Sequence, residues 1–336
     1  MINANIAKVK RKEVMLNKIN KINVKLTNRN ETMDNPNIYN DNEVETIDES
    51  SKGKINGYVS GHVVSVIRNM SDEEKKAYEK YKEISSKYPS DSVEYRNARL
   101  NWKVQKAGYG TREGVVAAAI YFIDHESKNV PYLWGGKKND VGVDGKWGKE
   151  RRVVQNYLNS KDQPTGSKPL DGLDCSGFVT WTIINGGFKS EGVNGNVISY
   201  SETYASDLKG AKNYSINKET FEKKDSNGDY LIKAGDLLYR YNHIAMIVDI
   251  NRTTNTLIIA EQRGYALKDE KGNYIYDPDS TGANGEKSRV LKGMEITPIK
   301  IDDFINGKYA KDDDHPKFEK IISMEDYYLN MDNVRK

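Results

Sequence analysis

Residues 174–179 read DCSGFV, and this stretch contains the only cysteine of the 336-residue chain. A lone Cys175 cannot form an intramolecular disulfide and has no second thiolate for a metal site. The stretch stands where a loop is expected to end and an apolar helix to begin, and Gly186 and Gly187 are expected to close that helix. A thiol in the first helical turn faces unpaired backbone N–H groups and the positive end of the helix dipole, which favour the reactive thiolate. The alternative role is a small buried hydrophobic side chain.

The composition describes a polar chain that is long enough to bury a sizeable core in one large domain or two. Hydrophobic residues make up 37% of the chain, charged residues make up 30%, and the net charge is +3. Such a small net charge creates no global field that would select nucleic acid. No apolar run approaches the roughly 20 residues of a membrane-spanning helix, and the N-terminus lacks the apolar core and cleavage site of a signal peptide. We therefore expect no nucleic-acid partner and no stable membrane insertion; the oligomeric state stays open.

Changes in composition along the chain divide it into four segments. Residues 1–58 begin basic, turn acidic and contain few aromatic residues, so they are expected to be flexible or weakly structured, with a basic amphipathic helix as the alternative. Residues 59–110 are expected to form a helical lead-in. Residues 111–310 are expected to form the main domain, and residues 311–336 a C-terminal tail.

Capping residues predict three helices between the first segment and the DCSGFV stretch. Ser71, Ser92 and Thr111 are each followed by acidic residues, which is typical of a helix start. The glycines of residues 108–110 end the second helix. The third helix contains the run 115–123, which is apolar nearly all round and is therefore expected to be buried.

A second region with chemical potential is the run HIAMIVDINRTTNTLIIAE at residues 243–261. Two apolar runs separated by turn residues predict an antiparallel hairpin. If its turn centres near Thr253, Glu261 lies opposite His243 or diagonally across from it on the same face. Gln262 then points to the other face, because side chains alternate along a strand. Glu261 is thus the expected partner of His243; Gln262, or no third residue, are the alternatives.

The segment before the nucleophile completes a recognisable pattern, because residues 131–136 read PYLWGG after the buried helix. Together with DCSGFV and a Gly-Asp-Leu before the strand that begins with His243, it resembles the NlpC-type papain-like cysteine peptidases, which cut peptidoglycan stem peptides. The resemblance covers about residues 111–266. It implies an α+β, papain-like fold in which the nucleophile helix packs on an antiparallel sheet, here with an N-terminal helical extension. Residues 137–173 are longer than expected for the family and are interpreted as an insertion lining one side of the cleft.

The resemblance also implies a catalytic set. Cys175 is the expected nucleophile and His243 the base, with a thiolate–imidazolium pair as the resting form. Members of the family most often place a histidine on the second strand of the hairpin, where this chain has Ile259. Glu261 has the same parity as Ile259 and is therefore the expected group that orients the imidazole.

Three further residues match the positions where the family binds the free amine end of the stem peptide: Tyr132, Asp174 and Ser176. A carboxylate and hydroxyl groups beside the nucleophile can hold an ammonium group by charge-assisted hydrogen bonds. The alternatives are a turn-capping role for Asp174 and Ser176 and a core position for Tyr132.

The resulting hypothesis is a secreted or cell-wall-associated cysteine endopeptidase that cuts the D-glutamyl–diamino acid bond through an acyl-enzyme. It needs no metal and no cofactor. Residues 225–229 (DSNGD) are interpreted as a hairpin turn, because the distant bidentate glutamate of a calcium loop is missing. A CHAP-type amidase, or an effector or toxin acting on another amide, would use the same triad. An inactive cell-wall-binding module would keep only the fold.

Overall fold

The computed structural model describes most of the chain after residue 46, and its described residues are 47–48, 52–59, 62–69, 71–133, 135–149, 171–189, 211–241, 243–266, 269, 271–274, 276–281, 287–289, 291–309 and 317–335. The chain divides into two compact units, residues 1–83 and 84–336. Several expectations lie outside the described residues: the basic start of the chain, Trp134 of the PYLWGG stretch, and most of the segment 137–173 beyond residue 149.

The first unit contains a three-stranded antiparallel sheet of order β1-β2-β3. Its strands are β1 (Ile47–Asp48), β2 (Lys52–Val59) and β3 (His62–Asn69), and the helix α2 (Asp72–Ser85) begins after them. Two expectations are therefore wrong in part: residues 1–58 include two strands, and the helical lead-in starts at Asp72 instead of residue 59. β3 is rich in valine and isoleucine, which favour extended backbone.

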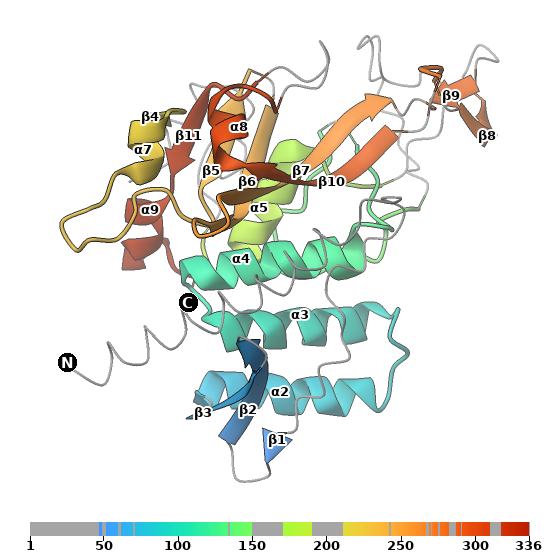
Figure 1. The fold of residues 1–336 in the computed structure, drawn as a ribbon. Helices are drawn as coiled ribbons and strands as arrows, with labels where there is room; N and C mark the ends of the chain where they lie inside the picture. The colour runs from blue at the N-terminus through green and yellow to red at the C-terminus, as the bar shows by residue number, and fades with distance from the viewer. Residues whose placement is uncertain are drawn as a thin grey trace. The chain divides into compact units, whose positions relative to one another are not determined.

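The second unit is α+β, as expected, with an open six-stranded antiparallel sheet of order β10-β7-β6-β5-β11-β4 (Figure 1). A separate pair, β8 with β9, is also antiparallel. The bounds of these strands are β4 Lys212–Ser215, β5 Leu237–Arg240, β6 His243–Asn251, β7 Thr256–Ala266, β8 Tyr276–Thr281, β9 Lys287–Arg289, β10 Leu291–Lys300 and β11 Lys320–Ser323.

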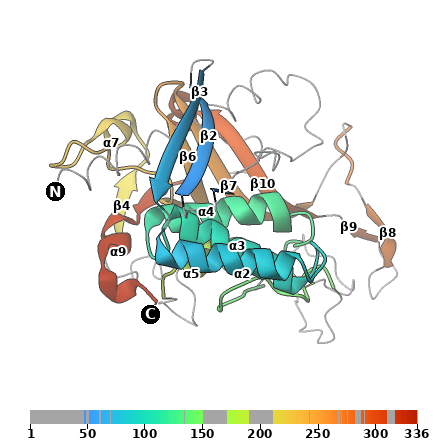
Figure 2. The ribbon, with the colours of Figure 1, turned by 90° about the horizontal axis from the view of Figure 1, so that it is seen from below.

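Helices cover the sheet in layers, because α5 packs against β6 and β7, α4 packs against α5, and α3 packs against α4 (Figures 1 and 2). α5 is buried along its whole length, which fits a sequence that contains no charged residue. The bounds are α3 Val93–Ala107, α4 Arg112–Tyr121 with a π-helical turn Phe122–Glu126, α5 Cys175–Asn185, α7 Lys218–Glu222, α8 Ile301–Ile305, α9 Glu325–Leu329 and a 3₁₀ turn Met331–Asn333.

The predicted helix starts are confirmed by their caps. The side chains of Ser71, Ser92 and Thr111 accept hydrogen bonds from backbone N–H groups three residues later. These bonds satisfy donors that the first turn of a helix leaves unpaired. None of the described helices combines the length and apolar character needed to cross a bilayer.

The C-terminal residues belong to the core instead of forming a tail. β11 lies between β5 and β4 in the sheet, so the main domain extends past residue 310. The end of the chain is also tied to the end of α5, because the N–H of Arg335 donates to the carbonyl of Gly187. The sequence signal was weak because β11 has only four residues.

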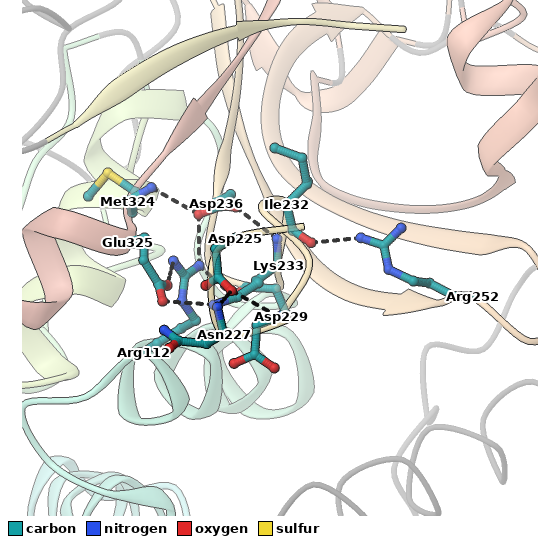
Figure 3. Close-up of polar contacts among 11 residues, drawn as sticks. Arg112, Asp225, Asn227, Asp229, Ile232, Lys233, Asp236, Arg252, Met324 and Glu325 are labelled. Carbon is teal, nitrogen blue, oxygen red and sulfur yellow. Dashed lines mark hydrogen bonds and ion pairs between the residues drawn. The ribbon is translucent and has the colours of Figure 1, made fainter. Parts of the chain in front are cut away.

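A partly buried ionic cluster joins the N-terminus of α4 to the segment before β5 and to α9 (Figure 3). Arg112 lies 2.7 Å from Asp236 and 2.7 Å from Glu325, and Lys233 pairs with the second oxygen of Glu325. The N–H of Met324 donates to the same oxygen of Asp236 that Arg112 binds. These contacts join segments that are far apart in sequence and fix the ends of three elements.

Candidate active site

Cys175 is the first residue of α5, as the sequence predicted. Asp174 caps the helix, because its Oδ1 accepts the N–H of Gly177 at 2.6 Å. The thiol is buried, with an exposed fraction of 4%. Backbone N–H groups of Ser176 and Ile244 are directed at the sulfur and favour its ionised form. The start of α5 and the start of β6 therefore meet at Sγ.

Glycines explain how the PYLWGG segment reaches the nucleophile. The N–H of Asp174 donates to the carbonyl of Gly136 at 3.0 Å, and Tyr132 forms a parallel bridge with Leu173. A Cβ atom on Gly177 would fall far inside van der Waals distance of the Gly136 carbonyl. The two halves of the sequence pattern are thus in backbone contact, and glycine is needed where they touch.

His243 and Glu261 are brought together as the hairpin reasoning predicted. His243 Nε2 lies 2.6 Å from Glu261 Oε2, and both side chains are buried. A carboxylate on one ring nitrogen fixes the tautomer of the imidazole and leaves the other nitrogen for proton exchange. The geometric prediction is confirmed. Gln262 points away, and its amide donates to the carbonyl of Val130.

A β-bulge decides between Glu261 and Gln262. Near the turn, Asp249 pairs with Ile258, whereas beyond the bulge Ile247 pairs with Ile259. Val248 is therefore an extra residue on β6. Without it, the register of the turn would continue and Gln262 would share the face of His243.

Two residues that the sequence did not single out hold Glu261. The hydroxyl of Tyr309 donates to Glu261 Oε1, and Arg263 Nε lies 3.1 Å from Glu261 Oε2. Arg263 also pairs with Glu295 at 2.6 Å. Arg263 could have been found from its position two residues after Glu261 on the same strand face, whereas Tyr309 follows α8 and carries no sequence signal.

The electrostatics favour a neutral thiol and a neutral imidazole, instead of the expected ion pair. Burial, reinforced by the charge of Asp174, raises the pKa of the Cys175 thiol to about 12. Burial also lowers the pKa of His243, together with the nearby Arg240 and Arg263, although Glu261 opposes this. No hydrogen bond joins Sγ to the imidazole among the hydrogen bonds of the described residues.

Two of the expected amine-binding residues, Asp174 and Ser176, already make hydrogen bonds within the protein. Asp174 accepts hydrogen bonds from Gly177 and Ser176 on one oxygen and from the N–H of Gly135 on the other. Ser176 Oγ also lies 3.2 Å from the ammonium of Lys137. The turn-capping alternative for Asp174 therefore accounts for its contacts.

Tyr132 lies beside the nucleophile. Burial, then the charges of Cys175 and Asp174, raise the pKa of its hydroxyl. Its half-buried ring packs on the backbone of Gly264 in β7, where a Cβ atom would collide with the ring. Tyr132 thus connects the loop before the nucleophile with the strand that bears Glu261.

The DSNGD loop is a hairpin turn, as predicted. Lys224 and Tyr230 form an antiparallel bridge, and Asp225 Oδ1 accepts the N–H groups of Asn227 and Asp229 (Figure 3). Among the described residues, no group of three or more His, Cys, Asp or Glu side chains is placed to hold a metal ion.

The arrangement has the chemical parts of a nucleophilic site: a thiol at a helix start, an imidazole from a neighbouring strand and a buried carboxylate on that imidazole. Comparison of the chain with protein-family models gives no match, and neither a curated protein nor a solved structure matches it significantly.

Proposed function

We propose that the chain is a papain-like cysteine peptidase of the NlpC type that hydrolyses peptidoglycan stem peptides between D-glutamate and a diamino acid. The observation that supports this most directly is the 2.6 Å contact between His243 and Glu261. His243 is the first residue of β6, and the backbone N–H of the following residue, Ile244, is directed at Cys175 Sγ. Such a substrate places the protein at the cell wall or outside the cell, so secretion is part of the same proposal.

The proposal gives each group a role. Glu261 holds Nε2 of His243, so Nδ1 would take the proton of the Cys175 thiol. The thiolate then forms a C–S bond with the amide carbon, and His243 returns the proton to the leaving amine as the C–N bond breaks. Water, deprotonated by His243, cleaves the acyl-enzyme and restores the thiol.

The oxyanion of the tetrahedral intermediates needs a donor close to Sγ. The N–H of Cys175 belongs to the first turn of α5, where the helix itself supplies no acceptor. This amide is the proposed oxyanion donor. Tyr132 remains a proposed substrate contact, whereas Asp174 and Ser176 would act by shaping the helix start.

The test is incubation of purified muropeptides with the full chain, followed by mass analysis of new amine termini. Cleavage at the D-glutamyl bond is expected, and Cys175→Ala should abolish it. Unchanged cleavage by Cys175→Ala would refute the proposal. Cleavage at a different amide would instead support a CHAP-type amidase or an effector with the same triad.

One observation favours an inactive binding module as a second candidate. The Cys175 thiol is 4% exposed and its pKa is raised, which are properties of an unreactive cysteine. Iodoacetamide labelling near neutral pH separates the candidates. Slow labelling that rises steeply with pH, combined with no hydrolysis of muropeptides, would favour the binding module.

A further inference from the structure

Arg240 flanks the candidate base. It is the last residue of β5 and lies directly opposite His243 in the β5–β6 ladder. Opposed residues of an antiparallel pair project from the same face of a sheet. Arg240 therefore shares a face with the imidazole and with its partner Glu261.

The other arginine near this end of the sheet, Arg263, has carboxylate partners. Arg263 pairs with Glu261 and with Glu295, and these contacts are 3.1 and 2.6 Å long. Glu261 also binds His243 and the hydroxyl of Tyr309. Its two oxygens therefore already bind three side chains, and none of these is Arg240.

Arg240 itself lacks such a partner. Within the described part of the chain it makes no hydrogen bond or ion pair, and its Nε is buried. Glu261, an ionised Cys175 and Glu319 attract it through space without a hydrogen bond, and one oxygen of Glu319 accepts the N–H of Tyr241. A half-buried guanidinium whose Nε has no hydrogen-bond partner is costly, and charged groups in such surroundings are candidates for ligand sites.

The guanidinium also lies near the nucleophile, because Arg240 is opposite His243 and the N–H of the next residue on β6, Ile244, is directed at Cys175 Sγ. The negative charge of an ionised Cys175 accordingly raises the pKa of Arg240. A planar guanidinium binds a carboxylate through two parallel hydrogen bonds. A carboxylate bound to Arg240 would thus be held close to the sulfur that attacks the substrate.

We propose that Arg240 is a specificity-determining residue that binds a carboxylate on the acyl side of the amide attacked by Cys175. The substrate class is a peptide in which an acidic residue precedes the scissile bond. This rests on the proposed function, whose D-glutamyl substrate belongs to that class, and adds the residue that would recognise its free carboxylate. A glutamyl residue has two carboxyl groups, so when one forms the scissile amide the other stays free to bind Arg240.

The test uses two alkylating reagents on the full chain. Iodoacetate and iodoacetamide both form an S–CH₂ bond with Cys175 and release iodide, while the thiol proton passes to His243 or to solvent. They differ only in carrying a carboxylate or an amide. Their second-order rate constants are measured by mass spectrometry. A change in the pKa of the thiol affects both rate constants equally, so their ratio reports only the recognition of the carboxylate.

Arg240→Gln should lower the iodoacetate-to-iodoacetamide ratio by at least about tenfold, because it removes a charged hydrogen-bond donor. Arg240→Lys keeps the positive charge but loses the planar guanidinium that can make two parallel hydrogen bonds, so it should give an intermediate ratio. Lys300→Gln is the matched control: Lys300 binds the carbonyl of Thr254 at the opposite end of the hairpin, so the ratio should not change. Circular dichroism checks that each variant is folded.

An unchanged ratio in Arg240→Gln would overturn the inference, and so would a wild-type thiol that neither reagent can label. Hydrolysis of paired peptides with glutamate or glutamine before the scissile bond is scored separately. If neither peptide is cut but the ratio still depends on Arg240, the peptidase proposal fails and the anion site stands. If both are cut equally well, the role of Arg240 in specificity is refuted.

Discussion

Glu261→Gln is the substitution that bears most directly on the proposed chemistry. Glu261 is fully buried, its Oε2 lies 2.6 Å from His243 Nε2 and 3.1 Å from Arg263 Nε, and its Oε1 accepts the Tyr309 hydroxyl. Glutamine keeps the shape of the side chain but removes its negative charge. It also places an N–H₂ group next to groups that already donate hydrogen bonds.

The size of the effect follows from these contacts. A hydrogen bond to a charged group contributes about 1.5–3 kcal/mol. Glu261 raises the pKa of His243 against the larger effect of burial, so its loss lowers that pKa further. The imidazole becomes a weaker base. Because general acid–base catalysis contributes about 10²–10⁴-fold, we expect kcat/KM to fall by about 10²-fold or more.

The assay is kcat/KM for muropeptide hydrolysis as a function of pH, together with the rate of iodoacetamide labelling. Tyr309→Phe is the matched comparison, because it removes one neutral donor from the same carboxylate and should cost only about two- to tenfold. Gln262→Ala should leave the pH profile unchanged, since Gln262 binds Val130 on the other face. If Glu261→Gln stays within about twofold of the wild type with the same pH profile, Glu261 does not act on His243.

Three further predictions concern stability and the placement of the site. Arg112→Gln leaves the charge of buried Asp236 unpaired and should destabilise the fold by about 3–5 kcal/mol, seen in denaturant unfolding; a loss below about 1 kcal/mol would contradict the role of this cluster. Gly264→Ala should push the Tyr132 ring out of place and lower kcat/KM, with about 1–3 kcal/mol of overpacking cost; full activity would show that the ring position is unimportant. Burial raises the pKa of Asp249 from 3.8 to about 7, so the folded state loses stability as pH rises from 3.8 towards 7 and stays less stable above pH 7. Asp249→Asn should remove this loss, which amounts to up to about 4 kcal/mol. If the difference in unfolding free energy between acid and neutral pH is the same in the variant and the wild type, the prediction is refuted.

The parts of the site that were predictable are those set by local rules. The cap at Asp174 and the alternation along β7 depend on nearest neighbours, so the helix start and the opposite faces of Glu261 and Gln262 followed from the sequence. The choice between Glu261 and Gln262 depended on more than alternation. The extra residue Val248 changes the register between the turn and the base, and a valine in an apolar run gives no signal of a bulge.

The parts that were missed depend on contacts over long sequence distances or on very short elements. Tyr309 reaches Glu261 across 48 positions, and Lys137 approaches Ser176 across 39. Four-residue β11 is stabilised by pairing with strands on both sides, which local propensity does not report.

The charges around the nucleophile argue for a substrate that brings its own negative charge. At the helix start, Asp174 is satisfied by three donors and attracted by Lys137, so neither charge there lacks a counterpart. At the sheet end, two carboxylates match Arg263, and Arg240 is left without a contact partner among the described residues. A neutral peptide would leave Arg240 without a hydrogen-bonded partner as the site loses water. A carboxylate would supply that partner, and the resulting ion pair would become stronger as water leaves. The discrimination between glutamate and glutamine peptides should therefore be larger in kcat/KM than in binding of the cleaved acid product.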